Sequence, residues 1–307
     1  MTALRQALVD YLSLRRSLGY KLRRAEKLLH QFIDFLDASG ARMITTEHAL
    51  AWACQSKDGG EYWWGYRLSV VRVFASYVHA NDASAEVPQR DLLPCRPRRA
   101  TPFLYSEQDI AALISAAGGL RTPLRRATYR TLIGLLAVTG MRVGEAINLD
   151  RRDLNAAGGV LLIHHAKFNK TREIPLHPST VAALRRYVDC VDNECAARRT
   201  PALFLSSFGT RLLYCNVHWT FQRLARQAGL SPRTVQCRPR IHDLRHAFAV
   251  NALLDACRGG SEAQCLTLLP TYLGHVDPAA SYWYLSAAPE LLAMAAERLE
   301  HHPSAKS

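Results

Sequence analysis

The sequence predicts a mainly α-helical protein with a small β-hairpin or sheet, an α+β fold of two domains. Apolar residues recur at helical spacing along most of the 307 residues. Strand character appears at residues 159–165 and 172–176. A run rich in proline and arginine, residues 88–102, interrupts the helical pattern, and the chain is long enough to bury a core on each side of it.

The first domain is expected at residues 1–87, and its elements are helices. The apolar residues of segment 25–36 fall on one face, as they do in an amphipathic helix. The next helix is expected to begin at Thr45 or Thr46, because threonine side chains suit the N-cap position. A third helix is predicted to run through residues 66–80.

Residues 88–102 are expected to form a basic linker, because four prolines and four arginines cannot build a core helix. Such a segment either follows a phosphate backbone or serves as a solvated tether. The second domain is expected at residues 103–307, where Ser106 suits the N-cap of the first helix. A further helix spans roughly residues 122–138, and Gly140 is placed to end it.

Two strands with a turn between them are predicted near the middle of the second domain. The strand segments read GVLLIHH and REIPL, and the run KFNKT between them has the character of a hairpin turn. From about residue 178 onward the pattern is helical again.

The charge of the chain is strongly positive. Lysine and arginine total 39 against 26 acidic residues, which gives a net charge of +13 and an isoelectric point near 9.6. An excess of this size indicates a polyanionic partner, most often nucleic acid, although a basic surface kept for solubility is the alternative. The expected DNA contacts lie in the first domain and the linker: Arg23, Arg24, Lys27, Arg96, Arg98 and Arg99.

The sequence lacks the patterns that usually identify several classes of protein. The N-terminal segment lacks the apolar run of a signal peptide, and no transmembrane helix is predicted, so a cytoplasmic, nucleoid-associated protein is expected. Eight scattered cysteines without a C-x-x-C pair argue against a zinc knuckle or a disulfide framework. Motifs for nucleotide binding, serine hydrolysis and zinc proteolysis are absent.

Phosphoryl transfer without a cofactor or a metal is a class of reaction that these absences leave open. It needs cations around the phosphate, a proton donor and a protein nucleophile. In TGMRVGEAINL, Arg142 follows a helix-ending glycine, and Glu145 lies on the same helical face, where it can orient the guanidinium. A surface ion pair is the alternative. In RIHDLRHAFAV, His242, Arg245 and His246 share the polar face of a predicted helix.

Lysines and histidines flank the predicted hairpin turn. Lys167 begins the turn and Lys170 stands at its far side, where either side chain can reach into a site and release a proton, although solvated lysines are also common there. No metal site is predicted from His164 and His165, because adjacent strand residues point to opposite faces.

In this order, the segments resemble the tyrosine recombinase (phage integrase) family over about residues 103–295. The resemblance rests on Arg142 in TGMRVGE, a lysine in a β-hairpin, His242-x-x-Arg245, LGH at 273–275 and a tyrosine shortly after. The helical first domain is similar in architecture to that family's core-binding domain. The ending YLGHVDPAASYWYLSAAPELL resembles integrases carried by mobile elements.

The resemblance implies a site-specific recombinase that cleaves and rejoins DNA strands through a 3′-phosphotyrosine intermediate. Arg142 and Arg245 would grip the scissile phosphate, and Glu145 would support the arginine. Lys167 would protonate the departing 5′-oxygen. Lys170 is the alternative, because Ala166 and Phe168 stand where the family often has glycines around the lysine.

The remaining roles also follow from the resemblance. His242 would assist the nucleophile, and His275 would donate to the phosphate or hold the site together. By themselves Tyr282 and Tyr284 are equivalent, but the family places its nucleophile nine residues after the histidine of LGH, which selects Tyr284.

The implied partner is a double-stranded recombination site bound by a homotetramer, with partner recombinases as an open possibility. Two competing functions remain. One is a type IB topoisomerase, which shares the chemistry, and the other is a DNA-binding accessory protein without catalysis.

Overall fold

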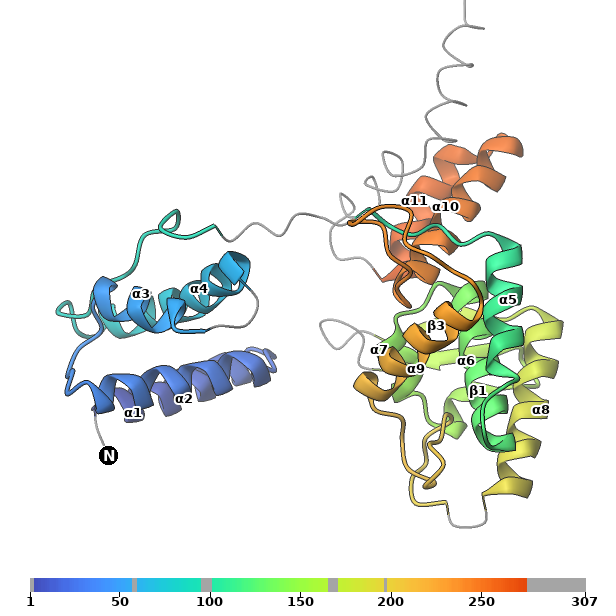
Figure 1. The fold of residues 1–307 in the computed structure, drawn as a ribbon, viewed down its shortest axis with the longest axis horizontal. Coiled ribbons are helices and arrows are strands. Elements are labelled where there is room, and N and C mark those ends of the chain that lie inside the picture. The colour runs from blue at the N-terminus through green and yellow to red at the C-terminus, as the bar shows by residue number, and fades with distance from the viewer. Residues whose placement is uncertain (1–2, 57–59, 95–100, 165–170, 196–197, 275–307) are drawn as a thin grey trace, which may run out of the picture. The chain divides into compact units, whose positions relative to one another are not determined.

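The computed structural model describes residues 3–56, 60–94, 101–164, 171–195 and 198–274. The chain divides into two compact units, Met1–Arg99 and Ala100–Ser307 (Figure 1). The predicted fold class is confirmed, because the described elements are helices apart from one small sheet. In the described part, no helix is both long and apolar enough to span a bilayer.

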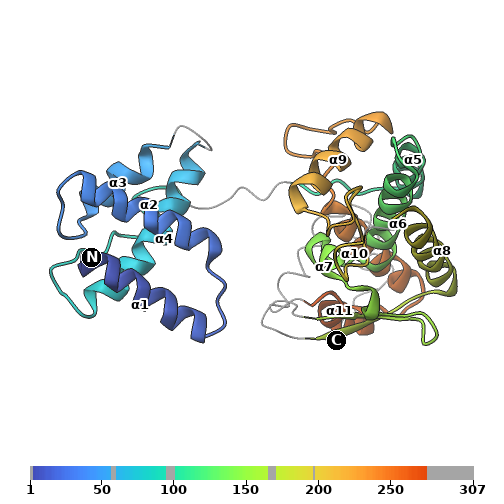
Figure 2. The same cartoon turned by 90° about the horizontal axis from the view of Figure 1, so that it is seen from below.

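The described part of the first unit consists of helices α1 (Ala3–Ser17), α2 (Arg23–Ala38), α3 (Thr46–Cys54) and α4 (Gly60–His79), as Figure 2 shows. The predicted apolar face of α2 is buried, with Phe32 and Leu36 fully inside the core. Thr45 is the N-cap of α3, and its hydroxyl accepts a hydrogen bond from the backbone N–H of His48 at 3.1 Å. The predicted start of this helix is therefore confirmed.

The chain after α4 packs back onto that helix. Nε of Arg72 donates to the carbonyl of Pro88 at 2.7 Å, and Nη2 donates to the carbonyl of Gln89 at 2.7 Å. Leu93 packs against the core of the unit. The first residues of the proline- and arginine-rich run thus lie against the first unit.

The second unit contains seven helices and three short strands among its described residues. The helices are α5 (Glu107–Ala117), α6 (Pro123–Thr139), α7 (Val143–Asn148), α8 (Pro178–Glu194), α9 (Tyr214–Gln227), α10 (Asp243–Arg258) and α11 (Glu262–Leu273). A 3-10 turn, η1, covers Arg151–Asp153. Helix α6 is central, because it contacts α5, α8 and α10 (Figure 1).

The sheet is antiparallel, with strand order β1 (Leu154–Asn155), β2 (Val160–Ile163), β3 (Arg172–Pro175). Strands β2 and β3 are the two predicted ones, and Ile163, the last residue of β2, pairs with Arg172, the first residue of β3. Strand β1 was not predicted, since two residues carry too little pattern to be recognised.

Predicted helix ends of the second unit are also confirmed. The Ser106 hydroxyl accepts from the N–H of Asp109, and the Asp109 carboxylate accepts from the N–H of Ser106, which completes a capping box. Gly140 ends α6 in the left-handed conformation, at φ 58°.

Gly140→Ala is expected to destabilise the second unit. A Cβ at this position would overlap Cδ1 of Phe248, and the positive φ adds backbone strain. We expect the free energy of unfolding to fall by about 2–4 kcal/mol, measured by chemical denaturation.

Gly144→Ala is the matched control, because Gly144 is a helical residue of α7 and a Cβ added to it would meet nothing within 4 Å. This substitution should leave stability unchanged or raise it by up to ~1 kcal/mol. Equal effects of the two substitutions would contradict the steric argument.

Candidate active site

Arg142 is held where two helices of the second unit meet. Helix α6 ends at Gly140, and Arg142 is the N-cap residue of α7, with an extended backbone conformation. Its side chain is 30 % exposed. Nη2 donates to the carbonyl of Gly274 at 3.1 Å, so Arg142 also contacts the end of α11.

The Glu145 carboxylate binds two arginines. It accepts from the backbone N–H of Arg142 at 2.8 Å and from Nη1 of the same residue at 2.8 Å. Arg172, the first residue of β3, donates Nη1 to Oε1 at 3.1 Å and Nη2 to Oε2 at 2.8 Å. Burial alone would raise the pKa of Glu145, but the hydrogen bonds from Arg172 and Arg142 outweigh it and lower that pKa. Glu145 is therefore an ionised anchor for both guanidinium groups.

Arg245 lies inside the protein rather than on an exposed polar face of α10. It is only 2 % exposed, and its Nη1 donates to the carbonyl of Gly140 at 2.9 Å. Its Nη2 donates to the carbonyl of Leu273 at 2.7 Å. The sequence pattern suggested an exposed position, but packing of α10 against α6 and α11 encloses the side chain.

Gly274 closes α11 beside the same side chains. Its φ is 66°, and a Cβ there would lie 2.8 Å from Nη1 of Arg172. The positive φ favours glycine here, and a larger residue would also make the Arg172 guanidinium shift. The glycine of the LGH motif therefore lets the chain approach the arginines closely just before His275.

His242 is the N-cap residue of α10; part of the residue reaches the surface, while neighbouring protein displaces water from its imidazole ring. Its ring lies 5.1 Å from that of His246, edge to face. Loss of hydrating water, followed by the positive charges of Arg245 and Arg142, lowers the pKa of His242 from 6.5 to about 4. Free of DNA, this imidazole is neutral at pH 7 and can accept a proton.

The lowered pKa of His242 makes stability depend on pH. Between pH 6.5 and about 4 the unfolded chain binds a proton on His242 that the folded protein does not bind. The free energy of unfolding is therefore expected to decrease as the pH falls through this window. A proton NMR titration of the His242 ring measures the pKa directly. His242→Gln should flatten the slope, and an observed pKa near 6.5 would contradict this prediction.

Several predicted site residues lie outside the described residues: Lys167, Lys170, His275, Tyr284, Arg96, Arg98 and Arg99. The predicted DNA contacts of the first unit, Arg23, Arg24 and Lys27, are all exposed. The guanidinium carbon of Arg24 lies 4.5 Å from the ring centre of Trp63.

Arg172 is the site residue that the sequence pattern did not indicate. It is separated from Glu145 by 27 residues, and only the fold brings them together. The one signal in the sequence was a charged residue at the start of a strand that follows a lysine-bearing turn, which is too weak to assign a contact.

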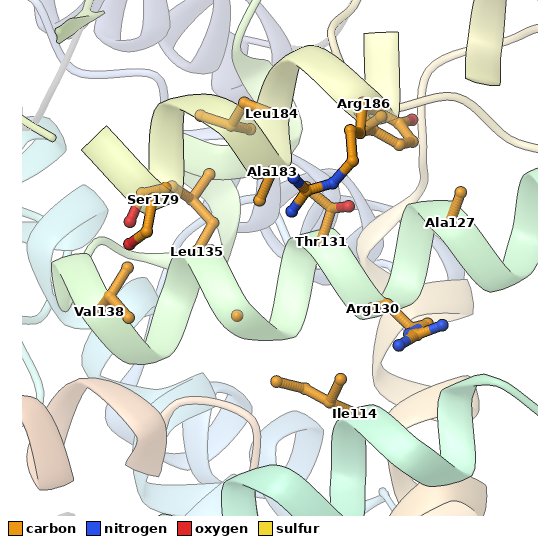
Figure 3. Close-up of a pocket in the computed structure, with 13 residues that line it drawn as sticks. Ile114, Ala127, Arg130, Thr131, Leu135, Val138, Ser179, Ala183, Leu184 and Arg186 are labelled. Carbon is orange, nitrogen blue, oxygen red and sulfur yellow. The ribbon is translucent and has the colours of Figure 1, made fainter. Parts of the chain in front are cut away.

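The described side chains include no group of three histidine, cysteine or acidic residues arranged to hold a metal ion. A groove of about 510 Å³ lies between α6 and α8, with Ala183 and Leu184 on one wall and Leu135 on the other (Figure 3). Arg142, Arg172 and Arg245 do not line it. The candidate active site is instead the cluster of Arg142, Arg172, Arg245 and Glu145, which hydrogen bonds join to one another or to the end of α11.

Comparison with known proteins shows the family of this chain. The phage integrase family matches residues 105–290, which is more than half of the chain. The chain belongs to the phage integrase family. A protein of Sinorhizobium fredii (strain NBRC 101917 / NGR234) named as an integrase/recombinase, y4rB, is 45% identical to this family member over 307 residues, 98% of each chain. Tyrosine recombinase XerD of Rhizobium meliloti (strain 1021) is 31% identical over 246 residues, 78% of this chain and 74% of the relative.

Solved structures of other integrases and recombinases share the fold. The Tn1549 transposon integrase, in complex with transposon right end DNA, has a TM-score of 0.66 at 16% identity and covers 98% of this chain and 100% of its own. The XerH site-specific recombinase, bound to palindromic difH substrate, has a TM-score of 0.64 at 19% identity, with coverages of 90% and 78%. This phage integrase family member is thus a tyrosine recombinase in sequence and fold.

Proposed function

We propose that this tyrosine recombinase cleaves and rejoins double-stranded DNA at specific sites, with Tyr284 as the nucleophile. The observation that carries the proposal is the convergence of Arg142 and Arg245, which come from different helices and both bind carbonyls at the 273–274 turn. This turn directly precedes His275 and the segment with Tyr284.

Arg142 and Arg245 bind the non-bridging oxygens of the scissile phosphate and stabilise the charge of its pentavalent transition state. The Tyr284 oxygen attacks phosphorus, a 3′-phosphotyrosine bond forms, and the bond to the 5′-oxygen breaks. His242, neutral in the free protein, accepts the phenolic proton. His275 donates to the phosphate.

Lys167, or Lys170 in its place, protonates the departing 5′-oxygen. The covalent intermediate retains the free energy of the broken bond. A 5′-hydroxyl can therefore reverse the attack and rejoin strands without ATP.

The DNA partner is supported by the structural relatives, which are complexes with transposon right end DNA and with a difH substrate. The net charge of +13 suits a polyanion, and Arg23, Arg24 and Lys27 would contact the duplex from the first unit, with Arg96, Arg98 and Arg99 in the linker. Binding should weaken steeply as salt rises, because phosphate contacts release counterions.

Recombination joins two sites with four strand cleavages, so we further propose a homotetramer on synapsed DNA, with or without partner recombinases. The y4rB relative and the transposon integrase support a mobile-element substrate, moved by integration, excision or transposition. The protein would work in the cytoplasm, on the nucleoid.

A suicide-substrate assay tests the function. Duplexes that the protein retains from a random library are nicked next to the cleavage position, so that the short 5′-hydroxyl strand is lost after attack. A covalent, denaturant-resistant protein–DNA adduct is expected on the nicked duplex. Recombinant products are expected when the protein acts on two intact sites. Relaxation of supercoiled DNA without recombinants would favour the topoisomerase alternative. Specific binding without an adduct would favour an accessory protein.

A further inference from the structure

We propose that Arg172 is a positioning residue that aligns Arg142 and the 273–274 turn through Glu145. This inference rests on the proposed function for its catalytic consequence. The geometric part stands on contacts of the described residues alone and can be tested without catalysis.

The first observation is the fork between Arg172 and Glu145. Two parallel hydrogen bonds, at 3.1 and 2.8 Å, join both nitrogens of the guanidinium end to both carboxylate oxygens. The side chains are only 13% and 10% exposed, so water competes little with this pair. A bidentate pair fixes direction as well as distance, which a single lysine contact cannot do.

The second observation is that the same carboxylate also accepts hydrogen bonds from Arg142. Oε1 of Glu145 accepts from Nη1 of both Arg142 and Arg172, and Oε2 accepts from the Arg142 backbone N–H and from Arg172. Loss of Arg172 would leave the carboxylate held by Arg142 alone. The Arg142 guanidinium would then be drawn toward neutralising Glu145 instead of a phosphate.

The third observation concerns Gly274. A Cβ at this residue would lie 2.8 Å from Nη1 of Arg172, so the guanidinium lies directly against the backbone of Gly274. The Gly274 carbonyl accepts from Arg142 on its other side. Arg172 therefore limits where the backbone of Gly274 can lie, one residue before His275 in the sequence.

The fourth observation is the place of Arg172 in the sheet. It pairs with Ile163 at the end of β2 and β3 that is nearest in sequence to Lys167 and Lys170. Strand β3 is thus bound through its first residue to Glu145, the carboxylate that also binds Arg142. Its Nε is buried and has no hydrogen-bond partner among the described residues, a cost in stability that the positioning contacts must offset.

The test compares Arg172→Gln and Arg172→Lys with Arg151→Gln. Arg151 is the matched control, because it also forms a bidentate pair, at 2.6 Å to each Asp192 oxygen, but on the exposed surface of the same unit. Each full-length variant is measured for adduct formation under single-turnover conditions, for duplex binding and for thermal unfolding.

For Arg172→Gln we expect adduct formation to slow by about 100-fold, since a shift of roughly 1 Å in a catalytic group costs that much. Duplex binding should stay within about threefold, because most affinity comes from other phosphate contacts. Arg172→Lys keeps the charge and should recover part of the rate. Glu145→Gln combined with Arg172→Gln should be no slower than the slower single variant, because both residues act as one unit.

Hydrogen exchange separates failure of this inference from failure of the proposed function. Arg172→Gln should speed exchange of the Gly274 and Ala146 amides, which donate to Thr271 and Arg142 in the native protein, while Arg151→Gln should not. Unchanged exchange, additive losses in the double variant, or equal losses in binding and rate would overturn the positioning role. If the wild-type protein formed no adduct but Arg172→Gln still exchanged these amides faster than wild type, only the proposed function would be refuted.

Discussion

Tyr284→Phe is expected to abolish the covalent protein–DNA adduct while duplex binding survives. In the proposed mechanism the phenolic oxygen of Tyr284 attacks phosphorus, and phenylalanine lacks only that atom. Loss of a covalent nucleophile removes the reaction path itself, so the rate should fall by more than about 10³-fold. The measurement is adduct formation on the nicked suicide duplex, with binding followed separately by gel shift.

Tyr282→Phe is the matched control for this prediction. Tyr282 stands two residues before Tyr284, and on a helix it would point roughly 200° away. The adduct should therefore form normally in Tyr282→Phe. Peptide mapping of the wild-type adduct must place the DNA on Tyr284. An adduct that persists in Tyr284→Phe and disappears in Tyr282→Phe would reverse the assignment.

Arg245→Lys is expected to have the second largest effect, on both chemistry and stability. Lysine cannot present the planar fork of donors that binds phosphate oxygens, so adduct formation should slow by about 10²–10³-fold. It also cannot reach the carbonyls of Gly140 and Leu273 together, which Arg245 binds at 2.9 and 2.7 Å. A buried carbonyl left unpaired should lower the free energy of unfolding by about 1–3 kcal/mol.

Arg258→Lys is the control in the same helix, because Arg258 is 68% exposed and pairs only with the surface residue Asp255 in the described contacts. It should change neither rate nor stability. Arg142→Lys is a second comparison, because the Arg142 side chain is 30% exposed. This substitution should slow cleavage but lower the free energy of unfolding less than Arg245→Lys does. If Arg245→Lys lowered stability but left the cleavage rate of the folded fraction unchanged, Arg245 would be structural only.

Local patterns predicted the elements that frame the site. The Thr45 and Ser106 caps and the Gly140 helix end are all present. Each depends on hydrogen bonds between residues only a few positions apart, so the sequence displays them directly. The pairing of Arg142 with Glu145 could also be predicted from the sequence, because the two residues are neighbours on one helical turn.

The burial of Arg245 and the part played by Arg172 could not be predicted from spacing. Helical periodicity placed Arg245 on the polar face of α10, but α6 and α11 cover that face and supply carbonyls to it. Arg172 reads as an ordinary strand residue until β3 is placed beside α7. In both cases the partner is more than 25 residues away in the chain.

The sequence by itself determined the family, the helical character of the chain and the candidate residues, because short motifs and local periodicity carry that information. The tertiary structure decided how these residues meet. It placed one carboxylate between Arg142 and Arg172, and it put Arg245 against the carbonyls of Gly140 and Leu273. Contacts between distant segments depend on which faces of the helices and strands pack together, and packing is a property of the whole fold rather than of any short stretch.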